Sequence, residues 1–294
     1  MLNELFVWLL NSLPLAAPLI LAALAGLFSE RSGVIDISLE GKMLTSACIG
    51  AWVAGGTHSA LIGLAGGVGA AILLSTLHWL FTQHYRIDHV VSGMALNALA
   101  LGATNFINTK FLSTAGEIPQ VPKLPVHFAG ATAFISLYVM LAFAAPFAVS
   151  SFITRTRWGL RLLAVGNSPG KSRLAGLSPV RIRWGAALVN GCLTGVAGVL
   201  IVDNAGRFTD NMTAGRGYIA LAALIIGGWR SLPALLACVV FGLFDALQIA
   251  LQGRSIAGIQ APPELWLSMP YLAAVLALAG LVKRSRPPAG LGQH

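Results

Sequence analysis

The stretch from Thr154 to Trp184 is the one long polar interruption in a chain that is otherwise mostly apolar. It contains seven Lys and Arg residues and not one Asp or Glu. Because membrane proteins keep Lys and Arg on the cytoplasmic side, a basic segment between apolar spans predicts a cytoplasmic loop, from which the topology can be counted outward. The seven residues are Arg155, Arg157, Arg161, Lys171, Arg173, Arg181 and Arg183.

The composition is that of a membrane protein. Of the 294 residues, 56% are hydrophobic and 10% are charged, whereas average soluble domains carry about 25% charged residues. A soluble chain of this composition could not cover its surface with polar groups. We therefore predict an all-α, polytopic transmembrane helical bundle that forms a single domain over residues 1–294.

The net charge of +9 would suit a nucleic-acid partner, but the distribution of the charge argues against one. Thirteen of the nineteen Lys and Arg residues fall in segments that we place inside the cell. Membrane insertion imposes this bias, so membrane lipid is an expected partner and nucleic acid is not.

Apolar segments define the expected topology, since about 20 apolar residues cross a bilayer core. The count is about nine crossings (eight to ten), with the N-terminus outside and the C-terminus in the cytoplasm beside Lys283, Arg284 and Arg286. The segment 217–229 is short, so it either enters half of the membrane or is buried in the bundle. The expected spans are 5–28, 34–56, 60–81, 89–107, 129–151, 185–203, 217–229, 233–251 and 267–282.

Glycines recur at a spacing of four within two of these spans, at Gly63 and Gly67 and at Gly191 and Gly195. Small residues at this spacing let helix backbones approach closely, so they predict tight packing and say nothing about a substrate.

Asp36, Glu40 and Lys42 place three ionisable groups near the start of the second span. Facing lipid would be costly, so they are expected to face protein or water. In a continuous helix Asp36 and Glu40 share a face, while Lys42 points elsewhere. Gly33 and Gly41 favour an interrupted helix at a transport pathway. Alternatively the charges lie near the cytoplasmic interface, with Lys42 reaching to water; in either case we expect Glu40 to face the bundle interior.

Polar residues inside later spans are the other pathway candidates. Asn97 and Asn190 each either bond to a neighbouring helix or line a polar cavity, and Asn97 is the better pathway candidate because it lies in mid-span. The Gly-rich stretch 203–217 is either backbone that enters the membrane from outside and lines a cavity, or an ordinary exterior loop. In the first case Phe208 would stack on a planar ring and Arg216 would close the site.

No pattern in the sequence indicates an enzyme. Residues 166–172, GNSPGKS, resemble a phosphate-binding loop, but three residues separate the glycines where that motif needs four. The six His residues are scattered, and no Ser lies in a Gly-x-Ser-x-Gly elbow. We predict no catalytic residue, no metal site and no cofactor.

Three stretches resemble the permease subunits of bacterial ABC importers, in the large family that serves branched-chain amino acids, simple sugars and nucleosides. They are residues 30–41 (ERSGVIDISLEG), residues 158–169 (WGLRLLAVGNSP) and residues 211–222 (NMTAGRGYIALA). The resemblance runs from about residue 15 to residue 282. The Leu-Glu-Gly and Thr-Ala-Gly-Arg-Gly sequences are most similar to the nucleoside branch, whose importers use a binding lipoprotein of the basic-membrane-protein type.

The resemblance implies a multi-pass protein of the bacterial inner membrane with three protein partners. These are a cytoplasmic ATP-binding cassette ATPase, a second, related permease chain in a heterodimer, and an extracytoplasmic substrate-binding lipoprotein. It also implies that the loop 152–184 carries a short coupling helix that docks in the ATPase. The residues that match the loop of the family are Trp158, Gly159, Arg161, Gly166 and Pro169.

The sequence departs from the nucleoside branch at two places near the expected pathway. Asp36-Ile37-Ser38 stands where that branch usually has Asn-Ile-Gly, and Lys42 stands where it usually has an uncharged residue. Nucleosides lead as the expected substrate, followed by simple sugars and branched-chain amino acids. The rival from another class is an ion-coupled secondary transporter, with Asp36, Glu40 or Asp245 as its proton site.

Overall fold

The computed structural model describes residues 2–112, 137–252, 255–256, 259–260, 266, 268–281 and 286–293. Most of these residues are helical, and turns or irregular segments join the helices. The two-residue strands β1 (Ser255–Ile256) and β2 (Ile259–Gln260) pair antiparallel. The prediction of an all-α fold is confirmed. Lys283 and Arg284 lie outside the described residues, as do residues 129–136 of the fifth expected span and the two end residues of the ninth.

The helices are joined mostly by short turns. Three of the helices continue into a turn of π-helix, at Leu80–His84 after α3, at Asn108–Leu112 after α4 and at Ala277–Leu281 after α12. In chain order they are α1 (Leu2–Arg31), α2 (Leu39–Thr57), α3 (Ala60–Trp79), α4 (His89–Ile107), α5 (Leu137–Arg155), α6 (Arg157–Asn167), α7 (Pro169–Leu174), α8 (Pro179–Ala205), α9 (Arg216–Ile226), α10 (Ser231–Leu251) and α12 (Met269–Leu276).

Six helices in the described part of the chain are long and apolar enough to cross a membrane, and they lie in α1, α3, α4, α5, α8 and α10. The remaining three expected spans differ from these. Helix α2 has 19 residues but is not among the six. The regions 217–229 and 267–282 form the shorter apolar helices Arg216–Ile226 and Ser268–Ala279. The count of nine crossings therefore stays a prediction.

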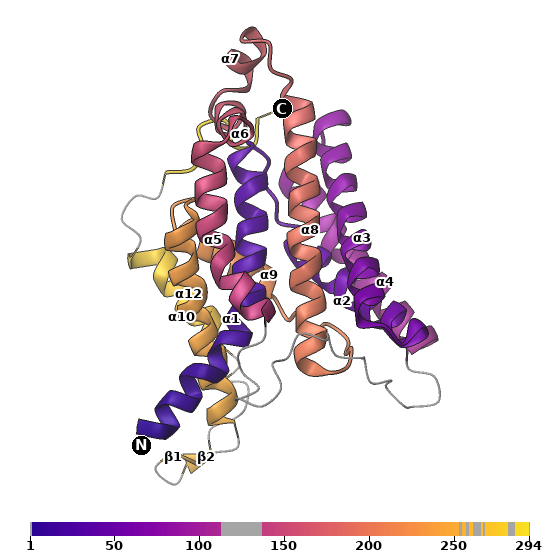
Figure 1. Ribbon diagram of the computed structural model, residues 1–294, viewed down its shortest axis with the longest axis vertical. Helices are drawn as coiled ribbons and strands as arrows, with labels where there is room; N and C mark the ends of the chain where they lie inside the picture. Colours follow the sequence, from indigo (N-terminus) through magenta and orange to yellow (C-terminus); the bar gives the residue numbers. More distant parts are fainter. Residues whose placement is uncertain are drawn as a thin grey trace.

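The segments that the charge pattern places inside the cell gather at one end of an elongated bundle. Helices α6 and α7 and the tail 286–293 lie at the top of Figure 1, whereas α1 begins at the bottom. At the upper end Arg31 Nε donates to Trp229 O at 2.8 Å. The amide of Gly290 donates to Gly166 O at 2.9 Å. Four segments that are distant in sequence thus meet on the side to which the basic residues assign them.

Helices α1 and α6 show how the apolar pattern determines burial. Every residue from Ala16 to Glu30 is buried, and α1 packs against both α8 and α10, as expected of a helix that is apolar on all sides. Helix α6 is instead amphipathic. Its Leu162 and Val165 are buried in the bundle, while Arg161 is exposed.

Helices α2, α3 and α8 approach closely at the glycines that the four-residue spacing singled out. A Cβ atom on Gly67 would lie 2.7 Å from Ser46 O of α2 and 2.6 Å from Val199 Cγ2 of α8. A Cβ atom on Gly195 would lie 2.6 Å from Val68 Cα of α3. These approaches leave no room for a methyl group, so the prediction of close packing is confirmed.

We expect Gly67→Ala to destabilise the bundle and Gly69→Ala to leave its stability unchanged or raised. Overpacking typically costs about 1–3 kcal/mol, whereas a Cβ atom on Gly69 of the same helix meets nothing within 4 Å. The free energy of unfolding of the purified protein, from SDS titration, measures both variants. Equal stabilities would contradict the close packing of α3.

Candidate functional site

The second expected span is interrupted at its start, and this corrects the predicted geometry of its charges. Helix α2 begins at Leu39, and residues 33–38 are not helical. Asp36 and Glu40 therefore do not share a helix face, and Lys42 does not point away from Asp36. Instead Lys42 Nζ lies 2.6 Å from Asp36 Oδ2, with both side chains about 1% exposed. Lys42 is paired inside the bundle rather than reaching to water.

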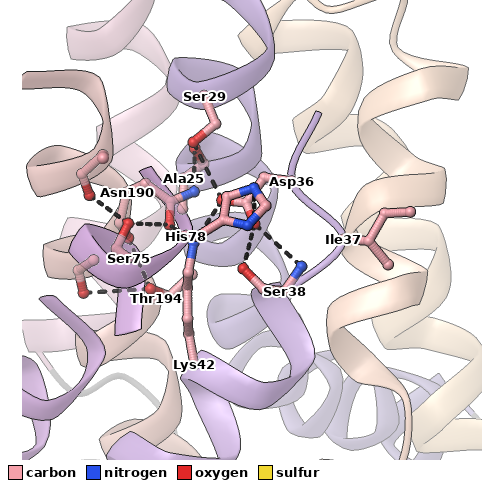
Figure 2. A network of polar contacts seen from close by, with 12 residues as sticks. Ala25, Ser29, Asp36, Ile37, Ser38, Lys42, Ser75, His78, Asn190 and Thr194 are labelled. Carbon is pink, nitrogen blue, oxygen red and sulfur yellow. Dashed lines mark hydrogen bonds and ion pairs between the residues drawn. The ribbon is translucent and has the colours of Figure 1, made fainter. Parts of the chain in front are cut away.

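Asp36 is the acceptor at the centre of this network (Figure 2). Its Oδ1 accepts hydrogen bonds from the Ser38 hydroxyl at 2.5 Å and from the Ser38 amide at 3.1 Å. Its Oδ2 accepts from Ser29 Oγ at 3.2 Å as well as from Lys42. His78 Nε2 of α3 lies 3.9 Å from Oδ1. A buried carboxylate of this kind is stabilised only when such partners surround it.

Asn190 extends the network to α8. Its Oδ1 accepts from Lys42 Nζ at 2.9 Å and from Ser75 Oγ of α3 at 3.3 Å. Its Nδ2 donates to Ala25 O of α1 at 2.9 Å (Figure 2). Asn190 therefore bonds α8 to its neighbours, which is the structural one of the two roles that the sequence left open. Neither Asp36 nor Asn190 lines the two cavities described below.

Glu40 faces the bundle interior, as expected, and it binds the N-terminal end of α9. Its Oε1 accepts from Thr213 Oγ1 at 2.6 Å and from the Gly215 amide at 2.7 Å. Its Oε2 accepts from the Gly217 amide at 2.7 Å. Unpaired amides and the helix dipole both favour a negative charge at a helix N-terminus. Glu40 thus fixes the short helix to α2.

Asn97 of α4 bonds across the start of α2 to α9. Its Oδ1 accepts from the Gly41 amide at 2.8 Å, and its Nδ2 donates to Ile37 O at 2.9 Å. The same Nδ2 donates to the Tyr218 hydroxyl at 2.9 Å. Asn97 therefore bonds to neighbouring helices, and it also lines a cavity.

This cavity, of about 400 Å³, lies where α2, α4 and α9 meet. Its volume falls within the range of about 300–1,000 Å³ that is usual for small-molecule sites. The wall is largely apolar with a few polar groups, as is typical of such sites. The lining residues are Glu40, Gly41, Leu44, Met94, Asn97, Ala98, Leu101, Asn211, Gly215 and Tyr218.

The sequence interpretation missed Tyr218. It stands within the stretch 211–222, whose resemblance to known permeases drew attention to the Thr-Ala-Gly-Arg-Gly motif rather than to the residue after it. An aromatic side chain three residues after Gly215, the glycine that precedes α9, is the signal that could have found it.

A second cavity, of about 280 Å³, lies between α1, α8 and the segment before α9. Arg216 lines it, and Arg216 Nε lies 3.5 Å from Asp245 Oδ2 of α10. The expectation that Phe208 stacks on a ligand does not fit this conformation. Phe208 is 1% exposed and packs in a core cluster with Leu44 and Val202.

The basic loop is built of α6 and α7, and most of its family-matching residues face inward. Trp158 packs against the rings of Phe28 and Phe152, with centroids 6.1 and 5.7 Å away. Gly159, Gly166 and Pro169 are buried as well, so they shape the loop. Arg161 is the exposed member of that set.

The tail 286–293 joins this loop to the segment after α1. The Gly290 amide donates to Gly166 O, and the Gly292 amide donates to Gly33 O, each at 2.9 Å. Gly33 has φ +95°, a conformation that strongly favours glycine. A Cβ atom on Gly166 would lie 1.9 Å from the carbonyl oxygen of Arg31. Three separate segments therefore meet where side chains would not fit.

The structure has membrane-length helices around a buried polar network, and its cavities lie beside a helix that is too short to span a bilayer. These features define a polytopic membrane protein with internal polar sites. Comparison with known proteins narrows this class. The sequence matches the family described as "Branched-chain amino acid transport system / permease component" over residues 8–281. The chain belongs to this family, and the resemblance seen in its motifs is confirmed.

Two relatives align over nearly the whole chain. The guanosine ABC transporter permease protein NupQ of Bacillus subtilis is 33% identical, over 94% of this chain and 92% of NupQ. The nucleoside ABC transporter permease protein NupC of Lactococcus lactis is 31% identical, over 97% of this chain and 95% of NupC. A solved ABC transporter of the metal-chelate type, in an inward-facing conformation, is similar in fold alone. It has 18% identity and a TM-score of 0.51, over 92% of this chain and 86% of that one.

We expect Lys42→Met to destabilise the protein by about 3–5 kcal/mol, because it leaves the Asp36 carboxylate buried without its cation. The double variant Asp36→Asn/Lys42→Met removes both charges and should be more stable than Lys42→Met alone. SDS titration of the purified variants measures both. A double variant no more stable than Lys42→Met would contradict an ion pair at this position.

Proposed function

We propose that this chain is the membrane-spanning permease subunit of an ATP-driven ABC importer and that it forms part of the translocation pathway for nucleosides. The main support for this proposal is the alignment of 94–97% of the chain with two permeases named for guanosine and nucleoside transport. The cavity beside α9, with its apolar wall and few polar groups, is of a kind that accepts a small polar molecule.

The proposed topology has about nine crossings in a bacterial inner membrane, with the N-terminus outside and the C-terminus in the cytoplasm. The gathering of Arg31, the basic loop and the tail 286–293 at one end of the bundle supports this orientation. The crossing at 217–229 needs the non-helical residues before α9 as well as the helix, since 11 helical residues extend about 16 Å and a bilayer core is about 30 Å thick.

Three protein partners complete the proposed importer. A cytoplasmic ATPase binds the loop 152–184 and hydrolyses the ATP that drives transport. A second, related permease chain covers the exposed side of the cavity, where Met94 is 60% exposed and Leu101 is 49% exposed. An extracytoplasmic lipoprotein delivers the substrate to the opposite end of the bundle.

The role of this chain is then to bind its substrate differently in two conformations. A ligand shifts an equilibrium only through its differential affinity for the two states, so the cavity has to change as the ATPases close and open. The interrupted segment 33–38 lies between the contact of Gly33 with the tail, which in turn binds the loop, and the contact of Glu40 with α9. Movement of the loop therefore has a short covalent route to the wall of the cavity.

Arg161→Glu should uncouple transport while leaving the protein folded, because Arg161 is exposed on α6 and the substitution reverses a charge on the surface proposed to dock in the ATPase. We expect uptake to fall about tenfold or more, with normal membrane insertion. Arg161→Lys keeps the charge and is the matched control. Gly159→Asp is a poorer test, since a Cβ atom there would lie 2.4 Å from Ile153 O and disturb the loop itself. Normal uptake by Arg161→Glu would remove the docking proposal.

The test of function is uptake of labelled nucleosides, ribose and leucine by cells deleted for this chain, with and without a protonophore under maintained ATP. We expect a selective loss of nucleoside uptake, and uptake in the wild type that is insensitive to the protonophore. Loss of ribose or leucine uptake instead would keep the importer and assign it to simple sugars or branched-chain amino acids. Collapse with the protonophore would favour an ion-coupled transporter.

A further inference from the structure

Tyr218 is an aromatic side chain on the wall of the 400 Å³ cavity. It is 45% exposed, although its neighbours Gly217 and Ile219 are buried. Its backbone belongs to the first turn of α9, and the same cavity wall contains the apolar side chains of Leu44 and Met94. A ring in such a place offers a flat face to whatever occupies the cavity.

Both ends of Tyr218 are held in place. On the backbone side, the carboxylate of Glu40 accepts from the amides of Gly215 and Gly217, directly before Tyr218. At the other end, Asn97 Nδ2 donates to the Tyr218 hydroxyl at 2.9 Å. Asn97 is fixed in turn by its bonds to α2. Preorganisation of this kind lowers the entropy cost of binding.

The Tyr218 hydroxyl still has a proton to donate. A phenol can donate one hydrogen bond and accept others, and Asn97 uses an acceptor position. Among the residues that the structure describes, no acceptor for the proton of the Tyr218 hydroxyl is present. Both the ring face and one donor are therefore free for a ligand.

We propose that Tyr218 is a substrate-contacting residue that recognises the nucleobase, and that Asn97 is its positioning residue. The inference rests on the proposed nucleoside transport. The ring stacks on the base, as aromatic side chains do on every kind of nucleobase. The hydroxyl donates to an oxygen or nitrogen acceptor on the base or ribose. The second cavity lacks this chemistry, because its described lining contains no aromatic side chain.

The assignment separates two kinds of selectivity. Stacking tolerates any base, because each base has an aromatic face. A ligand without a base, such as ribose, has nothing to stack and gains only the hydrogen bond. Tyr218 should therefore favour nucleosides over free sugars rather than one nucleoside over another.

The test compares Tyr218→Leu and Tyr218→Phe in the complete importer with its ATPase and loaded binding protein. Stacking is worth about 1–3 kcal/mol per base, so Tyr218→Leu should lower nucleoside uptake about tenfold. Tyr218→Phe keeps the ring and should lose much less. The amount of inserted protein should be unchanged in both variants. Tyr85→Leu is the matched control, because Tyr85 is 62% exposed and lines neither cavity.

A second measurement does not depend on transport rates. An azidoguanosine photoprobe bound to the complete importer should label the peptide that contains Tyr218, and excess guanosine should suppress the labelling. Wild-type uptake of nucleosides with unchanged uptake by Tyr218→Leu would overturn the role of Tyr218 and leave the proposed function intact. Suppressible labelling confined to the second cavity, near Leu15 and Met212, would overturn it as well. Absence of nucleoside uptake by the wild type would instead overturn the proposed function and the inference with it.

Discussion

A backbone that leaves the helical conformation inside a membrane protein needs protein groups to complete its hydrogen bonds, because lipid offers none. Two carboxylates meet this constraint here. Asp36 accepts the Ser38 amide at the start of α2, and Glu40 accepts the Gly215 and Gly217 amides at the start of α9. Asp36 carries a charge that its ion pair with Lys42 balances. The cavity exists because these interruptions of the helices are stabilised.

The interrupted segment 33–38 also connects the contact with the tail to the contact with α9. Gly33 touches the tail that binds the basic loop, and Glu40 holds the short helix that carries Tyr218. The ion pair lies between them, bonded through Asn190 to α8 and α1. The buried ion pair is therefore flanked by two contacts, the single hydrogen bond that Gly33 accepts from the tail and the three hydrogen bonds that Glu40 accepts at the start of α9. Such a division suits a protein in which the core stays fixed while the ends respond to partners.

The sequence predicted those features that depend on regular periodicity and composition. Each of these features follows from a pattern of residues that lies within a single helix. They are the membrane-length helices, the close approach of the helices at Gly67 and the inward direction of Glu40. The pairing of Lys42 with Asp36 could not be predicted in this way, because a helical spacing rule assumes a continuous helix and the helix begins only after Asp36. Phe208 was misjudged because a polar loop sequence does not reveal which of its side chains packs into the core. The role proposed for Tyr218 depends on its hydrogen bond with Asn97, which is distant in sequence and becomes adjacent only after folding.

The order in which the chain is made has a bearing on α9. Its 11 residues are too few to be held across a bilayer by their own apolar surface, so it depends on a receiving surface already present in the membrane. That surface carries the Glu40 carboxylate, on a helix that is synthesised well before α9. The arriving N-terminal amides therefore meet a waiting acceptor instead of hydrocarbon. Biogenesis of this protein thus resembles the docking of a ligand, with an earlier part of the chain serving as the receptor for a later one.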